Sequence, residues 1–217
     1  MGEAVAATLA EAGASIIAVD LLRDAAEARA AALRARGGRA EAYPCDLTNE
    51  SAVQGLASAV ASRHGGRIDS IVHLAGGFAM SSVADSALEV WQRQIALNLT
   101  TAALTTRAFL PLVREARGTL VYFGSAAALA GASAKNMAAY VTAKSGVLTL
   151  MRAVAEEERS NGVRANAVAP TSIRTTANVK SMGSDSAFVE REDVARIVLW
   201  LCSDASKPLT GQVVPLG

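Results

Sequence analysis

The sequence predicts an α/β protein with a doubly wound parallel sheet, in which one layer of strands lies between two layers of helices. Strand-length apolar runs alternate with longer helix-like segments along the whole chain, which is the pattern of βαβ units. The runs are apolar almost throughout, as strands buried on both faces are. Neither a repeat nor a low-complexity linker interrupts the alternation, so we expect one domain over residues 1–217.

Glycine, proline and capping residues set the expected boundaries. Gly13 and Gly37 close the first two helices, Thr48 or Asn49 caps the third, and Pro111 marks the end of the fourth, since proline lacks the N–H that a helix needs. The expected helices cover roughly residues 3–12, 24–36, 49–63, 88–109, 138–160 and 192–203. The expected strands cover residues 15–19, 40–43, 70–74, 119–123, 164–169 and 212–216.

Composition narrows the class of protein. Hydrophobic residues make up 51% of the 217 and charged residues 19%, which is typical of a globular chain. The net charge is +1 without a basic block, and no apolar run is long enough to cross a bilayer, so we expect neither a nucleic-acid nor a membrane partner. The N-terminus carries no basic stretch of a signal peptide. Cys45 and Cys202 have no metal-ligand neighbours, so we expect no metal site and a cytoplasmic location.

One pair of residues suggests acid–base chemistry. Tyr140 and Lys144 are four residues apart in a long expected helix, so both side chains project from one face. A nearby cation favours the phenolate and lowers the pKa of a tyrosine from about 10, which makes this tyrosine a candidate general acid. Ser125 ends the preceding strand, where its hydroxyl can hold a carbonyl oxygen close to that phenol. A surface pair with this spacing by chance is the alternative interpretation.

Several polar or glycine residues directly follow expected strands. In open parallel sheets, ligands bind beyond the carboxyl ends of the strands. Because these ends share one edge of the sheet, the shared location favours a site more than any single residue does. The residues at these ends are Asp20, Asp46, Ala75-Gly76-Gly77, Ser125 and Pro170.

These segments resemble, in order, the motifs of the short-chain dehydrogenase/reductase family, and the resemblance covers essentially the whole chain. Tyr140-Val-Thr-Ala-Lys144 matches the YxxxK motif, with Ser125 upstream and Asn98 as the helix asparagine. Asp46-Leu47 is similar to the adenine-side DL/DV pair, and Ala75-Gly76 to the AG of the NNAG turn. The segment from Pro170 through Ile173 to Thr175 is similar to the PGxxxT segment beside the nicotinamide. A Rossmann-like fold is what this resemblance implies.

The resemblance also implies roles. Tyr140 would be the acid in reduction and the base in oxidation, Lys144 would lower its pKa and bind the nicotinamide ribose, and Ser125 would orient the substrate oxygen. Asn98 would support a water relay behind Lys144. The nicotinamide cofactor would carry the hydride. The implied cofactor-binding residues are Gly2, Asp20, Asp46, Leu47, Ala75, Gly76, Tyr140, Lys144, Pro170, Ile173 and Thr175.

Three short departures from the family pattern change what we expect locally. His73-Leu74 replaces the two asparagines of NNAG, and we interpret His73 as a core residue in preference to a proton relay. Thr171 replaces a glycine and is expected to tighten the nicotinamide pocket. The lid stretch, residues 177–191, is short and has little apolar content, which favours a small or open substrate site.

A fourth departure concerns the start of the chain. Gly2 aligns with the last glycine of the family's TGxxxGxG turn, so the family's first strand and the other glycines have no counterpart, and the chain is N-terminally truncated relative to the family. A start assigned too late is our preferred explanation, and a shortened product is the alternative. We expect the sheet either to close the gap or to leave ladder groups unpaired. We also expect the 217-residue chain to bind dinucleotide poorly.

The function expected from the resemblance is an NAD(P)-dependent oxidoreductase that interconverts a small-molecule carbonyl and a secondary alcohol, such as a 3-oxoacyl-thioester reductase. Asp20, at the end of the second family strand, favours NAD over NADP, because its carboxylate would repel a 2′-phosphate. The two long helices imply a homodimer or homotetramer. A catalytically weak or inactive chain that only assembles with partners stays open as a second hypothesis. Lyase or epimerase chemistry is disfavoured by the complete Ser125, Tyr140 and Lys144 set.

Overall fold

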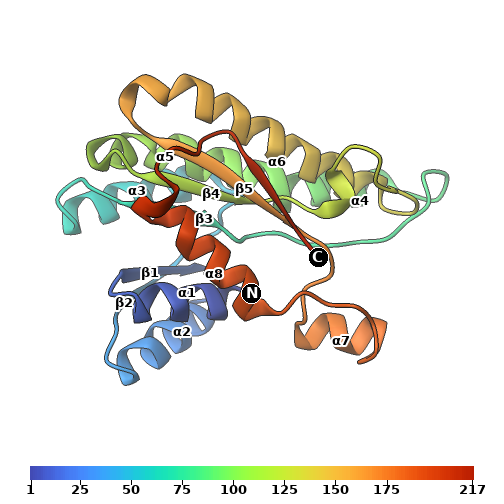
Figure 1. The fold of residues 1–217 in the computed structure, drawn as a ribbon, viewed down its shortest axis with the longest axis horizontal. Helices are drawn as coiled ribbons and strands as arrows, with labels where there is room; N and C mark the ends of the chain where they lie inside the picture. Colours follow the sequence, from blue (N-terminus) through green and yellow to red (C-terminus); the bar gives the residue numbers. More distant parts are fainter.

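The computed structural model describes all 217 residues, and helices and strands alternate along them (Figure 1). The helices are α1 (Gly2–Glu11), α2 (Arg23–Ala35), α3 (Glu50–Arg63), α4 (Leu88–Gln94), α5 (Thr101–Ala116), α6 (Ala138–Glu157), α7 (Thr176–Met182) and α8 (Arg191–Cys202). The strands are β1 (Ser15–Asp20), β2 (Arg39–Pro44), β3 (Ser70–His73), β4 (Thr119–Phe123), β5 (Arg164–Pro170) and β6 (Val213–Leu216). A π-helical turn, Ile95–Thr100, joins α4 to α5.

Helices cover both faces of the strands, as the sequence predicts. Figure 1 shows α5 and α6 on one side of β4 and β5, and α8 on the other. α1 packs against α8, and α2 packs against β1 and β2. None of the helices combines the length and the apolar composition that crossing a bilayer requires. The three-layer, Rossmann-like class is therefore confirmed.

The parallel strands form two sheets where we expected one. β1 and β2 make a two-stranded sheet, and β3-β4-β5-β6 make a four-stranded sheet in that order. Every neighbouring pair is parallel, with Ser15 opposite Arg39 in the small sheet and Ser70 opposite Thr119 in the large one. No ladder joins β1 to β3, so each keeps one edge without a strand partner. Of the two arrangements that the sequence left open, the chain therefore adopts the one with unpaired ladder edges.

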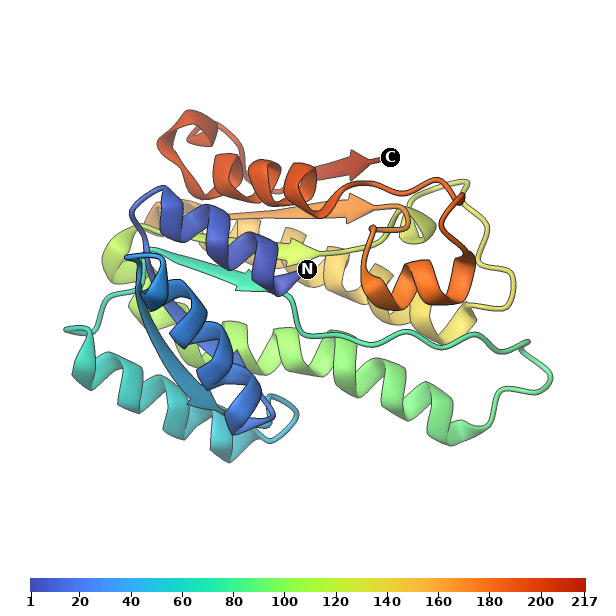
Figure 2. The same ribbon diagram turned by 90° about the horizontal axis from the view of Figure 1, so that it is seen from below.

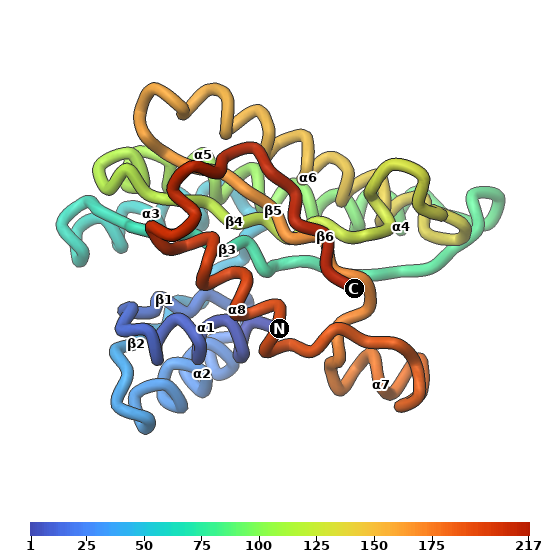
Figure 3. The backbone as a smooth tube through the Cα atoms, in the orientation of Figure 1, coloured from blue at the N-terminus to red at the C-terminus, as the bar shows by residue number.

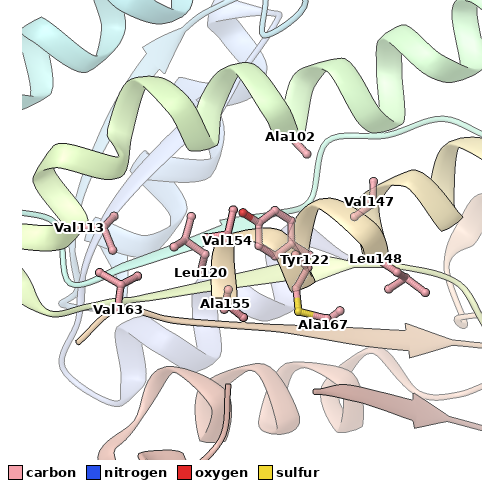
Figure 4. Packing of buried hydrophobic residues seen from close by; sticks show 12 residues of the cluster. Ala102, Val113, Leu120, Tyr122, Val147, Leu148, Val154, Ala155, Val163 and Ala167 are labelled. Carbon is pink, nitrogen blue, oxygen red and sulfur yellow. The ribbon is translucent and has the colours of Figure 1, made fainter. Parts of the chain in front are cut away.

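The large sheet holds the main core. All five residues of β4 are buried, and its Leu120 and Tyr122 pack between α5 and α6 (Figure 4). Val147 and Leu148 of α6 belong to the same cluster, together with Ala167 of β5. The core thus fixes α6, the helix with Tyr140, directly over the strand that ends at Ser125.

His73 lies inside this core. Its ring stacks on Tyr122 with the centroids 4.5 Å apart, and its Nε2 lies 3.3 Å from Thr106 Oγ1. Thr106 Oγ1 in turn lies 2.8 Å from the Tyr122 hydroxyl. Burial lowers the pKa of His73 to about 3, so the ring is neutral at neutral pH. This packing agrees with the interpretation of His73 as a core residue.

The expected boundaries hold within about three residues, with two exceptions. The helix expected to end near Phe109 continues to Ala116, and Pro111 lies inside it. Proline removes a single helical hydrogen bond, and buried Leu112 and Val113 hold the following turn against the core. Arg117, with φ 50°, then ends the helix in the left-handed region. The second exception is α7, which lies in the lid stretch where we expected no helix.

Candidate active site

α6 places Tyr140 and Lys144 on the face that meets the end of β4. Lys144 is only 7% exposed, and its Nζ donates to the Phe123 carbonyl oxygen at 2.8 Å. Burial lowers the pKa of Lys144 from 10.5 to about 8, because the charged form loses its hydration. The amine therefore remains mostly protonated at pH 7 while titrating close to neutrality.

Tyr140 lies between this amine and an aromatic ring from another loop. The Lys144 Nζ is 5.9 Å from the centroid of the Tyr140 ring, and the Phe78 ring meets it edge-on at a centroid distance of 5.0 Å. Burial raises the pKa of Tyr140, and the Ser125 side chain lowers it by a smaller amount. Our expectation that Lys144 lowers this pKa is wrong for this arrangement, because desolvation outweighs the other influences and Nζ is turned toward Phe123.

Ser125 lies at the carboxyl end of β4, directly after a glycine. A Cβ on Gly124 would come 2.7 Å from Leu148 Cδ2, so only glycine lets α6 approach the strand this closely. Ser125 is 9% exposed and caps the short helix Ala126–Ala128, where its Oγ accepts from the Ala127 N–H at 3.3 Å. The hydroxyl hydrogen stays available to a substrate oxygen.

Asn98 lies in the π-helical turn, a feature that is frequent at functional sites. Its Oδ1 accepts from the Gly77 N–H at 3.2 Å, and its Nδ2 donates to the Gly77 carbonyl at 2.9 Å. The same nitrogen donates to the main-chain oxygen of Gln94 at 3.0 Å and to its Oε1 at 3.2 Å. The side chain of Asn98 thus clamps the segment after β3 to α4.

A side chain at either glycine after β3 would come close to other side chains. A Cβ on Gly76 would lie 2.7 Å from Asn98 Oδ1 and 3.6 Å from Lys144 Nζ. A Cβ on Gly77 would lie 2.9 Å from Leu97 Cδ1. The Ala75-Gly76 segment therefore runs directly over the Asn98 and Lys144 side chains, and the ends of β3 and β4 contribute to one site.

The adenine-side candidates lie at the end of the small sheet. Asp20 pairs in register with Pro44, and its Oδ1 accepts from the Leu22 N–H at 3.0 Å. The Asp46 carboxylate accepts from the Thr48 hydroxyl at 2.6 Å and from the Thr48 N–H at 2.9 Å, and these bonds hold the pKa of Asp46 below its usual value. Leu47 is partly buried against the core at α3. No hydrogen bond joins this group to the residues around Tyr140.

The residues after β5 turn toward α7. Pro170 ends the strand, Ile173 packs into the core under α8, and Thr175 caps α7 by accepting from the Asn178 N–H at 3.1 Å. Beside Thr175 opens a cavity of about 460 Å³, in which Val179 is the one apolar lining residue. The polar lining matches the low apolar content of the lid stretch, and the expected small or open substrate site stays a prediction.

Thr171 and Gly2 complete the set of sequence-predicted positions. A Cβ on Gly217 would come 2.2 Å from Thr171 Oγ1, so the threonine side chain faces the end of β6, and our expectation that it narrows the nicotinamide pocket is not supported. Gly2 begins α1, and a Cβ there would lie 3.9 Å from Leu74, directly after β3. Figure 2 shows the N-terminus of α1 close to the arrowhead of β3.

These positions fit a nicotinamide dinucleotide unevenly. Around Lys144 the chain offers an amine beside a segment without a side chain, since a Cβ on Gly76 would meet Asn98 Oδ1 and Lys144 Nζ. At the other end Asp20 and Asp46 each have a carboxylate oxygen without a partner in the chain, suited to ribose or adenine. At the phosphate position only the first turn of α1 contributes N–H groups, and Glu3 is an acid in that turn.

Sequence reasoning missed three contributors. Phe78, which covers the Tyr140 ring, follows two glycines and is 59% exposed, so nothing in its pattern marks it. Gln94 is 2% exposed and binds Asn98, and a polar residue one turn before that asparagine on a buried face was its signal. The Phe123 carbonyl, which holds Lys144, belongs to the main chain and has no sequence signal.

Comparisons with known proteins agree with this arrangement. A family model described as enoyl-(acyl carrier protein) reductase matches residues 1–216. The chain is 31% identical to 2-(S)-hydroxypropyl-CoM dehydrogenase 3 of Xanthobacter autotrophicus, over 97% of this chain and 88% of that one. It is 33% identical to trans-4-hydroxycyclohexanecarboxylate dehydrogenase of Sinomonas cyclohexanicum, over 97% of this chain and 85% of that one.

A solved structure gives the same result for the fold. The crystal structure of a short chain dehydrogenase from Mycobacterium smegmatis superposes with a TM-score of 0.86 at 30% identity, covering 100% of this chain and 86% of that one. Sequence, fold and the match over nearly the full length therefore agree with the motif order. The chain belongs to the short-chain dehydrogenase/reductase family of oxidoreductases.

Proposed function

We propose that this protein interconverts a carbonyl compound and a secondary alcohol with NAD as cofactor, and that Tyr140 is the acid and base. The observation that carries the proposal is the group of four side chains around one point. Tyr140 and Lys144 share a helix face, and Ser125, after β4, lowers the pKa of the Tyr140 phenol. Asn98 holds the glycine segment after β3 close to Lys144. A 3-oxoacyl-thioester substrate is one candidate within this class. The names of both relatives above also specify hydroxylated substrates.

In this proposal each side chain acts through the group that it presents. The Ser125 hydroxyl donates to the substrate oxygen and orients it toward the phenol. Tyr140 gives its proton to that oxygen in reduction and takes it back in oxidation. Lys144, held by the Phe123 carbonyl and close to Gly76, would donate to the ribose hydroxyls of a bound nicotinamide. A bound nicotinamide would supply or accept the hydride.

The test replaces the proton donor alone. Tyr140→Phe keeps the ring packed against Phe78 and removes the hydroxyl, so turnover of NADH with cyclohexanone or ethyl acetoacetate is expected to fall about 10²–10⁴-fold. Tyr43→Phe, on β2, is the matched control and is expected to keep the wild-type rate. A Tyr140→Phe rate above about a tenth of wild type would mean that another group donates the proton.

If the wild-type chain shows no turnover with any ketone tested, the second hypothesis gains support. That hypothesis is a family member with an assembly role and weak or absent catalysis. It is favoured by one observation, the two strand edges that remain unpaired beside the dinucleotide site.

We propose NAD over NADP because a carboxylate ends β1. Asp20 has one oxygen bonded to the Leu22 N–H and one free, so it can accept from a ribose hydroxyl and would repel a 2′-phosphate. The neighbouring Leu21 and Leu22 offer a phosphate no charge, although Arg23 follows them. Comparing kcat/KM for NADH and NADPH decides the question, and a tenfold preference for NADPH would exclude the proposal.

We also propose a homodimer or homotetramer in the cytoplasm. The surfaces considered for the contact are the outer faces of α5 and α6, which are rich in alanine, leucine and threonine. Light scattering at micromolar concentration measures the mass directly, and a monomer would exclude self-association.

A further inference from the structure

The loop after β3 brings an aromatic ring onto Tyr140. Phe78 is 59% exposed, yet its ring meets the Tyr140 ring edge-on, with the centroids 5.0 Å apart and the planes at 83°. Edge-to-face pairs of this kind contribute roughly 0.5–1.5 kcal/mol beyond the area that they bury. Figure 3 traces this loop, residues 74–87, outward past the end of the sheet before it returns to α4.

Hydrogen bonds hold the loop on both sides of Phe78. On one side, Gly77 exchanges two hydrogen bonds with the Asn98 side chain, at 3.2 and 2.9 Å. On the other, the Ser81 N–H donates to the Asn136 carbonyl at 2.8 Å, and Ser81 pairs with Met137 directly before α6. Two attachments within five residues leave Phe78 little freedom to leave the phenol. The contact is therefore a built feature of the loop.

The groups around the Tyr140 ring divide by chemistry. Lys144 of α6 and Ser125 at the end of β4 are its polar neighbours, and Lys144 is the one charged group with its cation over the ring. Phe78 is its aromatic neighbour and brings no hydrogen-bonding atom. Removing the Phe78 ring would open that part of the phenol to water and leave the polar contacts in place.

We propose that Phe78 is a positioning residue for Tyr140, which fixes the phenol ring by edge-to-face contact and shields it from water. The proposal rests on the proposed function, in which Tyr140 moves the proton. Burial raises the pKa of Tyr140, and Phe78 contributes to that burial. The protonated phenol is the form that can donate to a substrate oxygen.

The test measures how readily Tyr140 reacts, without any need for turnover. Tetranitromethane nitrates tyrosines through the phenolate, and peptide mass spectrometry gives the extent at each of the three tyrosines. Phe78→Ala is expected to raise the Tyr140 nitration rate about threefold or more relative to Tyr43, because less burial lowers the pKa of the phenol and more phenolate forms. Phe78→Leu retains apolar bulk and is expected to stay closer to wild type.

Controls separate this effect from a loosened fold. Met80→Ala removes another exposed apolar side chain of the same loop and is expected to leave the Tyr140 to Tyr43 ratio unchanged. Tyr122 is fully buried and should remain unmodified in every variant that keeps its fold. If Phe78→Ala leaves the ratio at its wild-type value, or Met80→Ala raises it equally, the proposal is wrong. Failure of the proposed function would show instead as turnover that survives in Tyr140→Phe.

Discussion

The two sheets of this molecule differ in how completely they are enclosed. β4 and β5 each have a strand on both sides and helices on both faces, and every residue of β4 is buried. β1 has one neighbour, and its Ser15 and Asp20 are exposed while the residues between are only partly buried. The residues proposed for proton transfer lie at the end of the four-stranded sheet and on the helices that pack against it, and those proposed for the adenosine lie at the end of the two-stranded sheet. The chemical end of the site is therefore fixed by packing, whereas the nucleotide end is not.

The two sheets differ in enclosure because of their unpaired strand edges more than because of the residues in their strands. Ile16, Ile17 and Val19 of β1 are as apolar as the residues of β4, so the strand is suited to a central position. Yet no strand pairs with its second edge, and a two-stranded sheet alone is marginally stable in water. Contacts of α1 with α8 hold the small sheet to the rest of the molecule. We expect this sheet to open independently of the large one.

Hydrogen exchange should show the largest difference. We expect amides of β4 and β5 to exchange only when the protein unfolds globally, and those of β1 and β2 to exchange through local opening. We expect protection in the large sheet to be higher by about a thousandfold, on the order of 4 kcal/mol. Mass spectrometry of peptides covering 15–20 and 119–123 gives both values in one experiment. Equal protection would mean that the two sheets unfold as one cooperative unit.

Two alanine substitutions compare how tightly single residues of the two sheets are packed. Leu120→Ala empties a fully buried position on β4, and should lower the free energy of unfolding by about 3–4 kcal/mol. Ile17→Ala removes similar volume from β1, where the side chain is partly buried, and should cost about 1–2 kcal/mol. Urea denaturation measures both. A larger loss for Ile17→Ala would show that the small sheet is packed more tightly than its exposure indicates.

What the sequence predicts here is mostly what local pattern determines. The alternation of apolar runs gives the strands, and four-residue spacing puts Tyr140 and Lys144 on one face. The carboxyl ends of the strands give the location of Ser125 and Gly76, because parallel strands end at a common edge. The order of motifs gives the family.

The features that the sequence did not predict depend on tertiary packing. Pro111 stays within α5 because buried Leu112 and Val113 outweigh one lost hydrogen bond. Phe78 meets Tyr140 through loop attachments that no periodicity encodes. The direction of the Tyr140 pKa was wrong because spacing reveals a neighbouring cation but not the depth of burial. Packing between elements of the four-stranded sheet and its helices determines these features. The sequence pattern shows each element separately and does not show how the elements pack.

The pH dependence of the free energy of unfolding tests whether water reaches the buried Lys144 amine. The pKa of Lys144 falls from 10.5 to about 8 on folding, so between these values the unfolded chain binds the proton and the folded one does not. Stability from this group therefore rises as the pH rises from about 8 toward 10.5, and its cost is fully present below 8. Relative to Lys144→Met, wild type should gain up to roughly 3 kcal/mol over that window.

Urea midpoints of the two proteins between pH 7 and pH 10 measure this difference. Both proteins keep Tyr140, whose pKa burial raises, so its contribution to the pH dependence is common to the two. A difference between the two proteins that stays constant with pH would mean that water reaches the Lys144 amine, and that the enclosed region is more hydrated than its packing indicates.

The smallest expected effect lies at the open region, where α1 begins. Glu3 is an acid in the first turn of α1, where the helix dipole favours anions, and its partner Arg29 lies 3.0 Å away. Both side chains are largely exposed, so the ion pair itself contributes little to stability. Glu3→Gln removes the negative charge and frees Arg29. If the dinucleotide phosphates bind at this turn, affinity for NADH should rise about two- to fivefold, corresponding to roughly 0.3–1 kcal/mol.

Cofactor fluorescence measures the Kd, with Glu11→Gln at the far end of α1 as the matched control. The gain should shrink as salt is added, because the charges involved are exposed. No gain, or an equal gain for Glu11→Gln, would mean that the phosphates do not lie at the start of α1.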